Sequence, residues 1–193
     1  MQQLGEETQW IQAALQGDQE AFARLVEQYT SSVFNLCYRM LGSTHDAEDA
    51  TQEIFLRVYA RLGSYDLNRR FSTWLLSIAS NFCIDRLRRR KFAWVTLEDT
   101  AFMLPSSEAG PERRALQRER ADIIQAALQS IPSQYRLVLV LRYWHDLSYS
   151  EIATLTGLSE SALKTRLHRA RKQLAEALQE DGATLWDVET TTS

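Results

Sequence analysis

A run of basic side chains between residues 160 and 175 is the part of the sequence best suited to bind an anionic molecule. Five Lys or Arg residues stand in this stretch against one acid, whereas the whole chain of 193 residues has a net charge of −3. At helical spacing, one side of the stretch carries Lys164, Thr165, His168 and Lys172, with Arg169 and Arg171 beside it. Cationic and hydroxyl side chains on one helix face suit the phosphate groups and base edges of DNA.

The residues around this basic face predict how it is held in place. The opposite side has the apolar spacing of one buried helix face, formed by Leu163, Leu167, Ala170, Leu174 and Leu178. Upstream, Ser148 and Glu151 have the spacing of a capping box, and Gly157 stands where a first helix must end. Two short helices with a tight turn and a basic second helix match the helix-turn-helix of DNA-binding proteins. A plain helical hairpin with a solvated basic face is the alternative, and the contrast with the acidic chain favours DNA.

A second candidate for nucleic-acid binding is the helix predicted over residues 71–90. Its inner face is apolar, while a neighbouring stripe carries Trp74, Ser77, Asn81 and Arg88, close to the basic run RLRRRK at residues 86–91. Cations at a helix C-terminus are often only a favourable solvated end. Beside an aromatic residue and an Asn, the same cations could also grip a phosphate backbone and hold an unstacked base.

A third candidate is an acidic stripe on the helix predicted over residues 44–62. Its inner face is Ala47, Ala50, Ile54, Val58 and Leu62, and a separate stripe carries Asp49, Gln52, Glu53 and Leu56. Acids near a helix start suit the helix dipole and favour solubility. They could equally form a docking face for a basic partner, and charge alone does not separate the two readings.

The helix pattern predicts an all-α protein of two small helical domains. The first domain is residues 1–91, and no strand pattern is present. Residues 92–111 contain Pro, Ser, Gly and acids but no basic residue, which predicts an extended acidic linker. Proline at positions 111 and 132 can begin helices of the second domain, residues 112–180, which ends with the helix-turn-helix. Residues 181–193 are predicted to be a flexible tail.

Composition excludes several classes of protein. A content of 45% hydrophobic and 24% charged residues is that of a soluble globular chain. No secretory signal is recognisable, and the longest aliphatic run, residues 137–141, is too short to span a bilayer, so we expect no membrane insertion. Cys37 and Cys83 stand far apart in apolar helical settings, which predicts buried free thiols in a reducing cytoplasm. No His or Cys set has ligand spacing, so we expect no metal, no cofactor and no catalytic residue.

Four segments together resemble a known family. They are DQEAFARLVEQY, DAEDATQEIFLRVY, FSTWLLSIASNFCIDRLRRR and IPSQYRLVLVLRYWHDLSYSEIATLTGLSESALKTRLHRARKQL, in this order around the acidic linker. The pattern resembles the extracytoplasmic-function sigma factors of bacterial RNA polymerase, over roughly residues 10 to 178. The resemblance implies a sigma-2-like first domain, a sigma-4-like second domain and a non-enzymatic, cytoplasmic specificity subunit.

The resemblance also implies a role for each candidate surface. Contacts with the minus-35 duplex are expected from Ser161, Lys164, Thr165, His168, Arg169 and Lys172. Contacts with melted minus-10 DNA are expected from Tyr65, Asn68, Arg69, Arg70, Phe71, Asn81 and Arg88, with one base flipped into a pocket of the loop over residues 63–70. Contacts with polymerase core are expected from Asp49, Gln52, Glu53, Phe55 and Leu56. Trp74 matches a family tryptophan expected to support the loop.

The implied partners are promoter DNA and RNA polymerase core, through the clamp helices of the largest subunit and the flap of the second subunit. The acidic linker would pass through the polymerase channel that carries template and nascent RNA. An anti-sigma factor that holds the chain inactive is a further expected partner.

Two other classes of protein compete with this reading. One is a stand-alone helix-turn-helix regulator with a helical sensor domain, which leaves the basic run beside Asn81 and the acidic linker unexplained. The other is a nucleic-acid enzyme. The sequence does not support it, because it has no clustered carboxylates, no His and Cys set and no Gly-rich phosphate loop. Copurification with RNA polymerase and promoter-specific transcription would separate the sigma factor from both.

Overall fold

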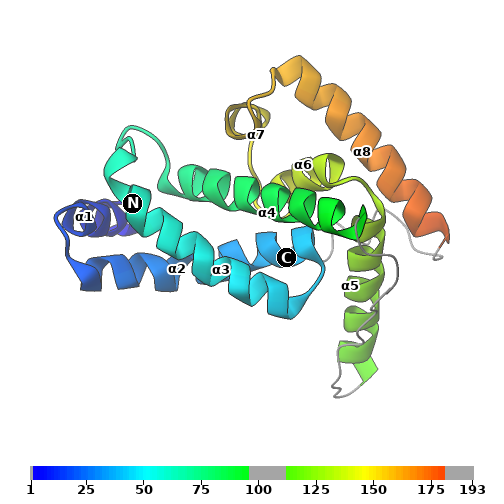
Figure 1. Cartoon of the computed structure of the whole chain (residues 1–193), viewed down its shortest axis with the longest axis horizontal. Helices are drawn as coiled ribbons and strands as arrows, with labels where there is room; N and C mark the ends of the chain where they lie inside the picture. Colours follow the sequence, from blue (N-terminus) through cyan, green and yellow to red (C-terminus); the bar gives the residue numbers. More distant parts are fainter. Residues whose placement is uncertain (1, 96–111, 181–193) are drawn as a thin grey trace.

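The computed structural model of the chain describes residues 2–95 and 112–180, and every regular element in them is a helix (Figure 1). The all-α prediction is therefore confirmed for the described residues. The first group of elements is α1 (Gln2–Leu15), α2 (Gln19–Leu41), α3 (Thr44–Arg61), the 3-10 turn η1 (Leu62–Ser64) and α4 (Phe71–Val95). The second group is α5 (Glu112–Ser130), α6 (Ser133–Tyr143), α7 (Tyr149–Thr156) and α8 (Glu160–Glu180).

Local capping interactions fix where the helices begin and end. The Asp18 carboxylate accepts hydrogen bonds from the amides of Glu20 and Ala21 at the start of α2. Gly42 ends α2 with a φ of 82°, a conformation that favours glycine. These caps use the free amide and carbonyl groups that every helix end exposes.

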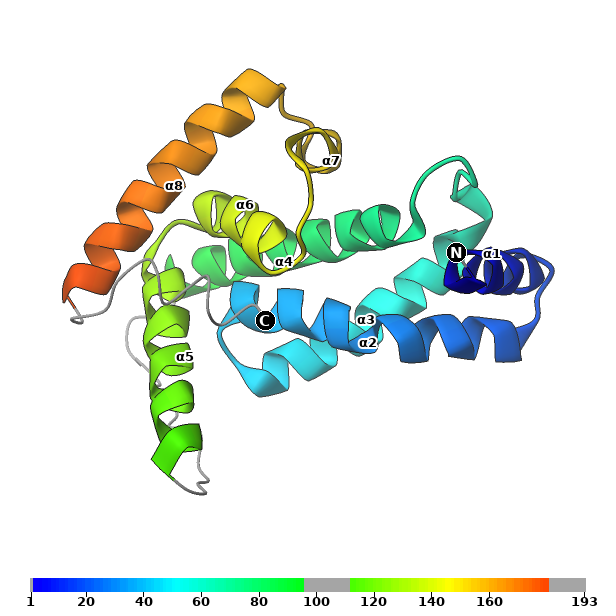
Figure 2. The same cartoon turned by 180° about the vertical axis from the view of Figure 1, so that it is seen from behind.

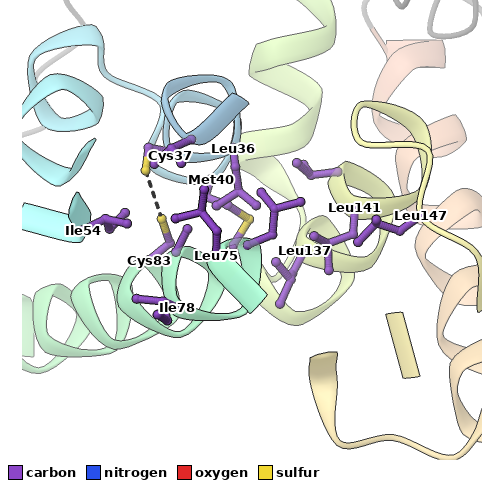
Figure 3. Packing of buried hydrophobic residues seen from close by; sticks show 14 of the residues in the cluster. Leu36, Cys37, Met40, Ile54, Leu75, Ile78, Cys83, Leu137, Leu141 and Leu147 are labelled. Atoms are coloured by element: carbon purple, nitrogen blue, oxygen red, sulfur yellow. Dashed lines mark hydrogen bonds between the residues drawn. The ribbon is translucent and has the colours of Figure 1, made fainter. Parts of the chain in front are cut away.

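The first group of helices is a bundle in which α2, α3 and α4 contact one another and α1 lies on α2. The predicted inner face of α3 is buried, with Ala47, Ala50, Ile54 and Val58 all fully inaccessible. The two thiols of Cys37 and Cys83 are buried, as predicted, and their sulfur atoms lie 3.8 Å apart across the α2–α4 contact (Figure 3). These contacts form the rigid base of the loop and of the exposed stripes on α3 and α4.

The second group packs α8 against α5, α6 and α7. The predicted buried face of α8 is confirmed, since Leu163, Leu167, Ala170, Leu174 and Leu178 are at most 2% exposed. The outer side of α8 is thereby left facing away from the rest of the molecule, as both views show (Figures 1 and 2).

The two groups of helices are in direct contact with each other. Helices α5 and α6 contact α2, and α6 and α7 contact α4 (Figure 2). Apolar side chains make one continuous cluster through both groups, in which Leu36, Met40 and Leu75 lie near Leu137 and Leu141 (Figure 3). The sequence pattern predicted two helical domains, but it did not predict that their apolar side chains form one shared core.

One helix boundary differs from the prediction. Helix α4 continues to Val95 instead of ending near Arg90, so residues 92–95 of the predicted linker are helical. The residues FAWV contain no helix breaker, which explains the longer helix. The rest of the predicted linker, residues 96–111, and the predicted tail, residues 181–193, lie outside the described residues.

Candidate nucleic-acid and partner interfaces

The basic face of α8 is exposed over its whole predicted length. The exposed residues are Ser161, Lys164, Thr165, His168, Arg169 and Lys172. The Thr165 hydroxyl donates to the Ser161 carbonyl at 3.1 Å, and the Lys172 ammonium lies 3.8 Å from the Glu176 carboxylate. Both are surface interactions of low strength, so the side chains can exchange them for contacts with DNA.

The turn before α8 sets the direction of this face. Both halves of the predicted capping box are present, because Ser148 accepts from the Glu151 amide and Glu151 accepts from the Ser148 amide. Gly157 closes α7 with a φ of 69°, and the Leu158 amide donates to the Ala153 carbonyl at 3.1 Å. Because the turn and the buried face both fix α8, the direction of its exposed outer side is set by the fold, as it is for the second helix of a helix-turn-helix.

The loop between η1 and α4 is supported by a cluster of aromatic rings. The Tyr65 ring lies 5.4 Å from Phe71 and 5.1 Å from Trp74, and Phe71 lies 5.6 Å from Trp74, measured between centroids. Tyr65 also donates from its hydroxyl to the Arg69 carbonyl. Tyr65 is 9% exposed and Phe71 is 2% exposed, so both rings are buried and support the loop from the protein interior.

The tip of the loop is polar and is ordered by an Asp side chain. Asp66 accepts at 3.0 Å from both the backbone amide and the side-chain amide of Asn68, and these hydrogen bonds lower the pKa of the Asp66 carboxyl. Leu67 at this tip is 52% exposed, an apolar side chain presented to solvent. Asn68 and Arg69 are exposed beside it.

The remaining residues predicted to contact minus-10 DNA lie along α4 and at the end of the loop. Asn81 and Arg88 are exposed, and the Arg88 guanidinium lies 3.0 Å from the Asp85 carboxylate. Arg70 is exposed as well, but its guanidinium lies 3.1 Å from the carboxylate of Glu151 in α7.

The outer stripe of α3 is confirmed as an exposed face. Asp49, Gln52, Glu53 and Leu56 are exposed, and Leu56 reaches 67%. Phe55, predicted as a direct contact, is 7% exposed and instead packs inward beneath the stripe. An apolar Leu56 surrounded by acids is a surface suited to a partner that offers both cations and an apolar side chain.

A groove of about 610 Å³ lies beside this stripe, between α3 and α4. Its lining combines carboxylates and cations from both helices: Asp49, Glu53, Arg57, Phe82, Asp85, Arg86, Arg89 and Arg90. The sequence reading placed Asp49 and Glu53 here but missed Arg57, whose guanidinium lies 4.6 Å over the Phe82 ring. The spacing of Glu53 and Arg57, one helical turn apart, was the available signal.

Asp46 joins α3 to the basic end of α4. Partial burial raises the pKa of the Asp46 carboxyl, but hydrogen bonds and charges from Arg90 and Arg86 outweigh it and hold the pKa below its usual value. The Arg86 guanidinium lies 2.7 Å from Asp46. Arg86 and Arg90 of the basic run RLRRRK are therefore neutralised by Asp46, and Arg88, Arg89 and Lys91 are its exposed members.

No group of three or more His, Cys, Asp or Glu side chains within residues 2–95 and 112–180 is arranged to hold a metal ion. In the same residues, no helix has the length and apolar character needed to cross a membrane.

Comparison with known families gives two matches in chain order. Sigma-70 region 2 matches residues 25–93, and sigma-70 region 4 matches residues 121–174. The first match contains the loop and the stripes of α3 and α4, and the second contains the helix-turn-helix.

Similar proteins match over nearly the whole chain. The ECF RNA polymerase sigma factor SigW of Bacillus subtilis is 38% identical over 178 residues, which are 88% of this chain and 95% of SigW. The RNA polymerase sigma-H factor of Pseudomonas aeruginosa is 32% identical over 183 residues, which are 90% of this chain and 94% of that factor.

Two solved structures of similar fold are complexes. CnrH in complex with the cytosolic domain of CnrY aligns with a TM-score of 0.66 and 25% identity, over 91% of this chain and 99% of that one. The sigma factor RpoE in complex with the anti-sigma factor NepR from Bartonella quintana aligns with a TM-score of 0.65 and 19% identity, over 83% of this chain and 98% of that one.

Proposed function

The chain belongs to the extracytoplasmic-function sigma factors of bacterial RNA polymerase, and from this membership we propose which of its surfaces carries each step of initiation. It is an alternative sigma factor that directs transcription initiation. The reading as a stand-alone regulator with a sensor domain is set aside, because sigma-70 region 2 matches the half of the chain that would be the sensor. We assign the chain the role of a cytoplasmic specificity subunit without catalytic residues of its own.

Upstream recognition is proposed for the exposed face of α8. Lys164, His168 and Arg169 would reach base edges or phosphates of the minus-35 duplex, with Ser161, Thr165 and Lys172 around them. The supporting observation is that these side chains share one exposed, preorganised side of a helix whose other side is buried. A second helix held in this way is the reading element of a helix-turn-helix.

Capture of melted minus-10 DNA is proposed for the loop and the outer stripe of α4. Asn68, Arg69, Arg70, Asn81 and Arg88 would contact the unpaired strand directly. Tyr65, Phe71 and Trp74 would act by holding the loop, unless a base displaces one of the rings. Leu67 is an additional candidate because it presents an apolar surface on which a flipped base can pack.

Binding of polymerase core is proposed for the outer stripe of α3 and the groove beside it. Asp49, Gln52, Glu53 and Leu56 would face the clamp helices of the largest subunit, with Phe55 as a buried support. The second domain would contact the flap of the second subunit. By domain, residues 1–95 would bind core and minus-10 DNA, 96–111 would link, 112–180 would read minus-35 DNA, and 181–193 would be a tail.

An anti-sigma partner is part of this proposal, since CnrH, the structural relative at 25% identity, was solved with the cytosolic domain of CnrY. Such a partner would hold the chain away from polymerase.

The observation that carries the proposal is the presence on one chain of two exposed polar and basic faces, α8 in the second domain and the loop with α4 in the first. The test is transcription in a defined mixture of core polymerase, the purified chain and promoter DNA, with the transcripts sequenced. Start sites that share one minus-35 and one minus-10 sequence are the expected result. Transcripts that do not depend on the added chain would contradict the proposal.

A further inference from the structure

The basic end of α4 places several cations beside the acidic outer stripe of α3, with which α4 is in contact (Figure 1). An acidic stripe suits a basic partner surface. The groove between the two helices is nevertheless lined by four guanidiniums and three carboxylates. Guanidiniums left unpaired there would repel a basic partner or neutralise the acids that should meet it. The way in which these arginines are held therefore affects what the stripe can bind.

The arginines of the groove are held in two different ways. Arg57 pairs with Glu53 at 3.0 Å on the surface, and its guanidinium lies 4.6 Å over the Phe82 ring. A surface pair of this kind is weak, so a partner can exchange it for its own contact. Arg86 and Arg90, in contrast, are bound by a half-buried carboxylate of α3, that of Asp46.

Asp46 holds both arginines from the first turn of α3. The Arg86 guanidinium lies 2.7 Å from Oδ1 of Asp46, and the Arg90 guanidinium, one turn further along α4, contacts the same oxygen. The Asp46 side chain is only 17% exposed, so this cluster belongs to the α3–α4 contact and not to the outer stripe. Its position is fixed, because the Asp46 backbone amide donates to the Ser43 hydroxyl at 3.3 Å. The helix dipole also favours an anion in this turn.

Arg86 lies within reach of the outer stripe as well. Its guanidinium is 4.0 Å from the carboxylate of Asp49, a side chain that is 50% exposed. Asp46 and Asp49 stand three residues apart on one helix and so compete for the same arginine. The contact with Asp46 is shorter and less exposed, which makes this charge-assisted hydrogen bond the stronger of the two. The other neighbour of Asp49 is the exposed imidazole of His45 at 3.7 Å, which a partner can displace.

We propose that Asp46 is a positioning residue of the polymerase-binding surface: by holding Arg86 and Arg90 against the start of α3, it keeps the Asp49 carboxylate available for a cation of polymerase core. This inference rests on the proposed function of the α3 stripe. Asp46 acts through Arg86 and needs no contact with polymerase. Without the charge of Asp46, Arg86 turns to Asp49 and neutralises it before the partner arrives.

A double-mutant cycle on binding to core polymerase tests this role, with the labelled full chain followed by fluorescence anisotropy. Asp49→Asn should weaken binding by about fivefold in Kd, the size of one exposed ion pair. Asp46→Asn should cause a similar loss, although asparagine has nearly the same shape and position 46 is not on the outer stripe. The two changes together should bind no more weakly than either alone, because Asp49 is already neutralised when Asp46 has lost its charge.

Arg86→Gln added to Asp46→Asn provides a rescue. This change removes the guanidinium that would occupy Asp49, so the Kd for core should return to within about twofold of the native value. Asp49→Asn should again cost about fivefold in the rescued chain. Melting temperature and circular dichroism show whether each variant keeps its fold. A rescued chain that is folded but still binds core weakly overturns the proposal, whether or not Asp46→Asn folds alone.

Glu48→Gln is the matched control, because Glu48 is an exposed acid two residues along α3 and the variant loses the same charge. It should bind core like the native chain. If the losses from Asp46→Asn and Asp49→Asn multiply as independent effects, Asp46 acts through stability alone and the inference is overturned, while binding of polymerase by the stripe stands. An Asp49→Asn chain that binds core as tightly as the native one counts instead against the proposed function of the stripe.

Discussion

Single residues on the reading faces are exposed side chains fixed to helices whose inner faces are buried. Lys164, Arg169 and Asn81 contribute nothing to a core, whereas Leu163 and Leu167 on the same turns of α8 are almost fully inaccessible. Substitution of the exposed side chains should therefore change binding without changing stability, and substitution of the buried leucines should change stability.

Lys164→Ala and Arg169→Ala should each reduce the binding free energy that favours the native minus-35 sequence over altered sequences, by about 1–3 kcal/mol if the side chain contacts a base edge. Binding to a series of duplexes with single changes in that element measures the effect. Arg24→Ala, which removes an equal charge from an exposed site on α2, is the control. Leu167→Ala should instead destabilise the fold by about 2–5 kcal/mol, because it opens a cavity in the core. If Lys164→Ala transcribes like the native chain from every upstream sequence, the assigned face is wrong.

Asn81→Ala should reduce affinity for a single-stranded minus-10 oligonucleotide and impair transcription from duplex promoters, while polymerase binding is retained. A premelted bubble should rescue transcription only in part, since the missing contact acts on the unpaired base. Asn35→Ala, at an exposed asparagine of α2, gives the matched control. Unchanged affinity of Asn81→Ala for the oligonucleotide would remove Asn81 from the site.

His145 makes the stability of the molecule depend on pH. Burial lowers the pKa of His145 to about 4, against an opposing effect of the Asp146 carboxylate, and its Nε2 atom is buried without a hydrogen-bond partner. In the unfolded chain His145 takes up its proton near pH 6.5, whereas in the folded chain it does so only near pH 4. The free energy of unfolding is therefore highest above pH 6.5 and falls by up to about 3 kcal/mol as the pH drops to about 4. Urea unfolding of the native chain and of His145→Gln should show this loss only in the native chain. The exposed His168→Gln variant should behave like the native chain; a loss of equal size in His145→Gln would contradict the assignment.

Helical spacing predicted the exposed side chains of α8 and α3, whereas the burial of single aromatic residues had no such signal. The α8 face and the α3 stripe follow from helical spacing, since one buried face determines the other. Phe55, Tyr65 and Phe71 were assigned contacts through family resemblance, yet all three are buried. The burial of Tyr65 and Phe71 depends on aromatic packing between α2, α4 and the loop, which no local spacing records.

At the scale of elements, α3 has a buried inner face and a separate, exposed outer stripe. Asp49 of its outer stripe lies 4.0 Å from the half-buried Arg86, whereas Glu53 pairs with the surface cation Arg57 at 3.0 Å. Exposed pairs of this kind stabilise a fold by about 0–1 kcal/mol. The stripe can therefore be altered without unfolding the bundle beneath it.

Glu53→Lys should abolish assembly with polymerase core while the melting temperature and circular dichroism barely change. The reversed charge opposes any basic partner surface and the neighbouring Arg57. Glu27→Lys, at an exposed site on α2, carries the same change of charge and should assemble normally. Gel filtration with core polymerase measures assembly. Equal loss of folding and binding in Glu53→Lys would favour a capping role for the acids.

Element boundaries were predictable where a cap or glycine marks them and not where the chain simply continues. The starts of α2 and α7 and the ends at Gly42 and Gly157 follow from residue type. The extension of α4 to Val95 has no such marker. Contact between domains was equally invisible, because Arg136 reads as a surface arginine until Met40 and Gln129 are brought to it by the fold.

At the scale of the whole molecule, the segment between α4 and α5 sets how far apart the two reading faces can act. With α4 ending at Val95 and α5 beginning at Glu112, the joining segment is residues 96–111. A segment of that length reaches at most about 55 Å when fully extended. This corresponds to roughly 16 base pairs of duplex, fewer than the predicted 92–111 linker would reach. Holding both domains on one chain makes the second DNA contact effectively intramolecular.

Cleavage near Ser106, at a protease site inserted there, should therefore abolish promoter-specific initiation, although each half stays folded and the first half still binds polymerase. Ser106 lies outside the described residues, so the prediction rests on chain length and connectivity alone. Shortening the segment by about 10 residues should reduce its reach to about 20 Å and lower activity most on promoters with the longest spacer. Transcription from promoters of graded spacer length, with intact, shortened and cut chains, measures both effects. An uncut chain carrying the inserted site is the control, and cut halves that transcribe as well as it does when mixed at equal concentration would show that covalent linkage is not required.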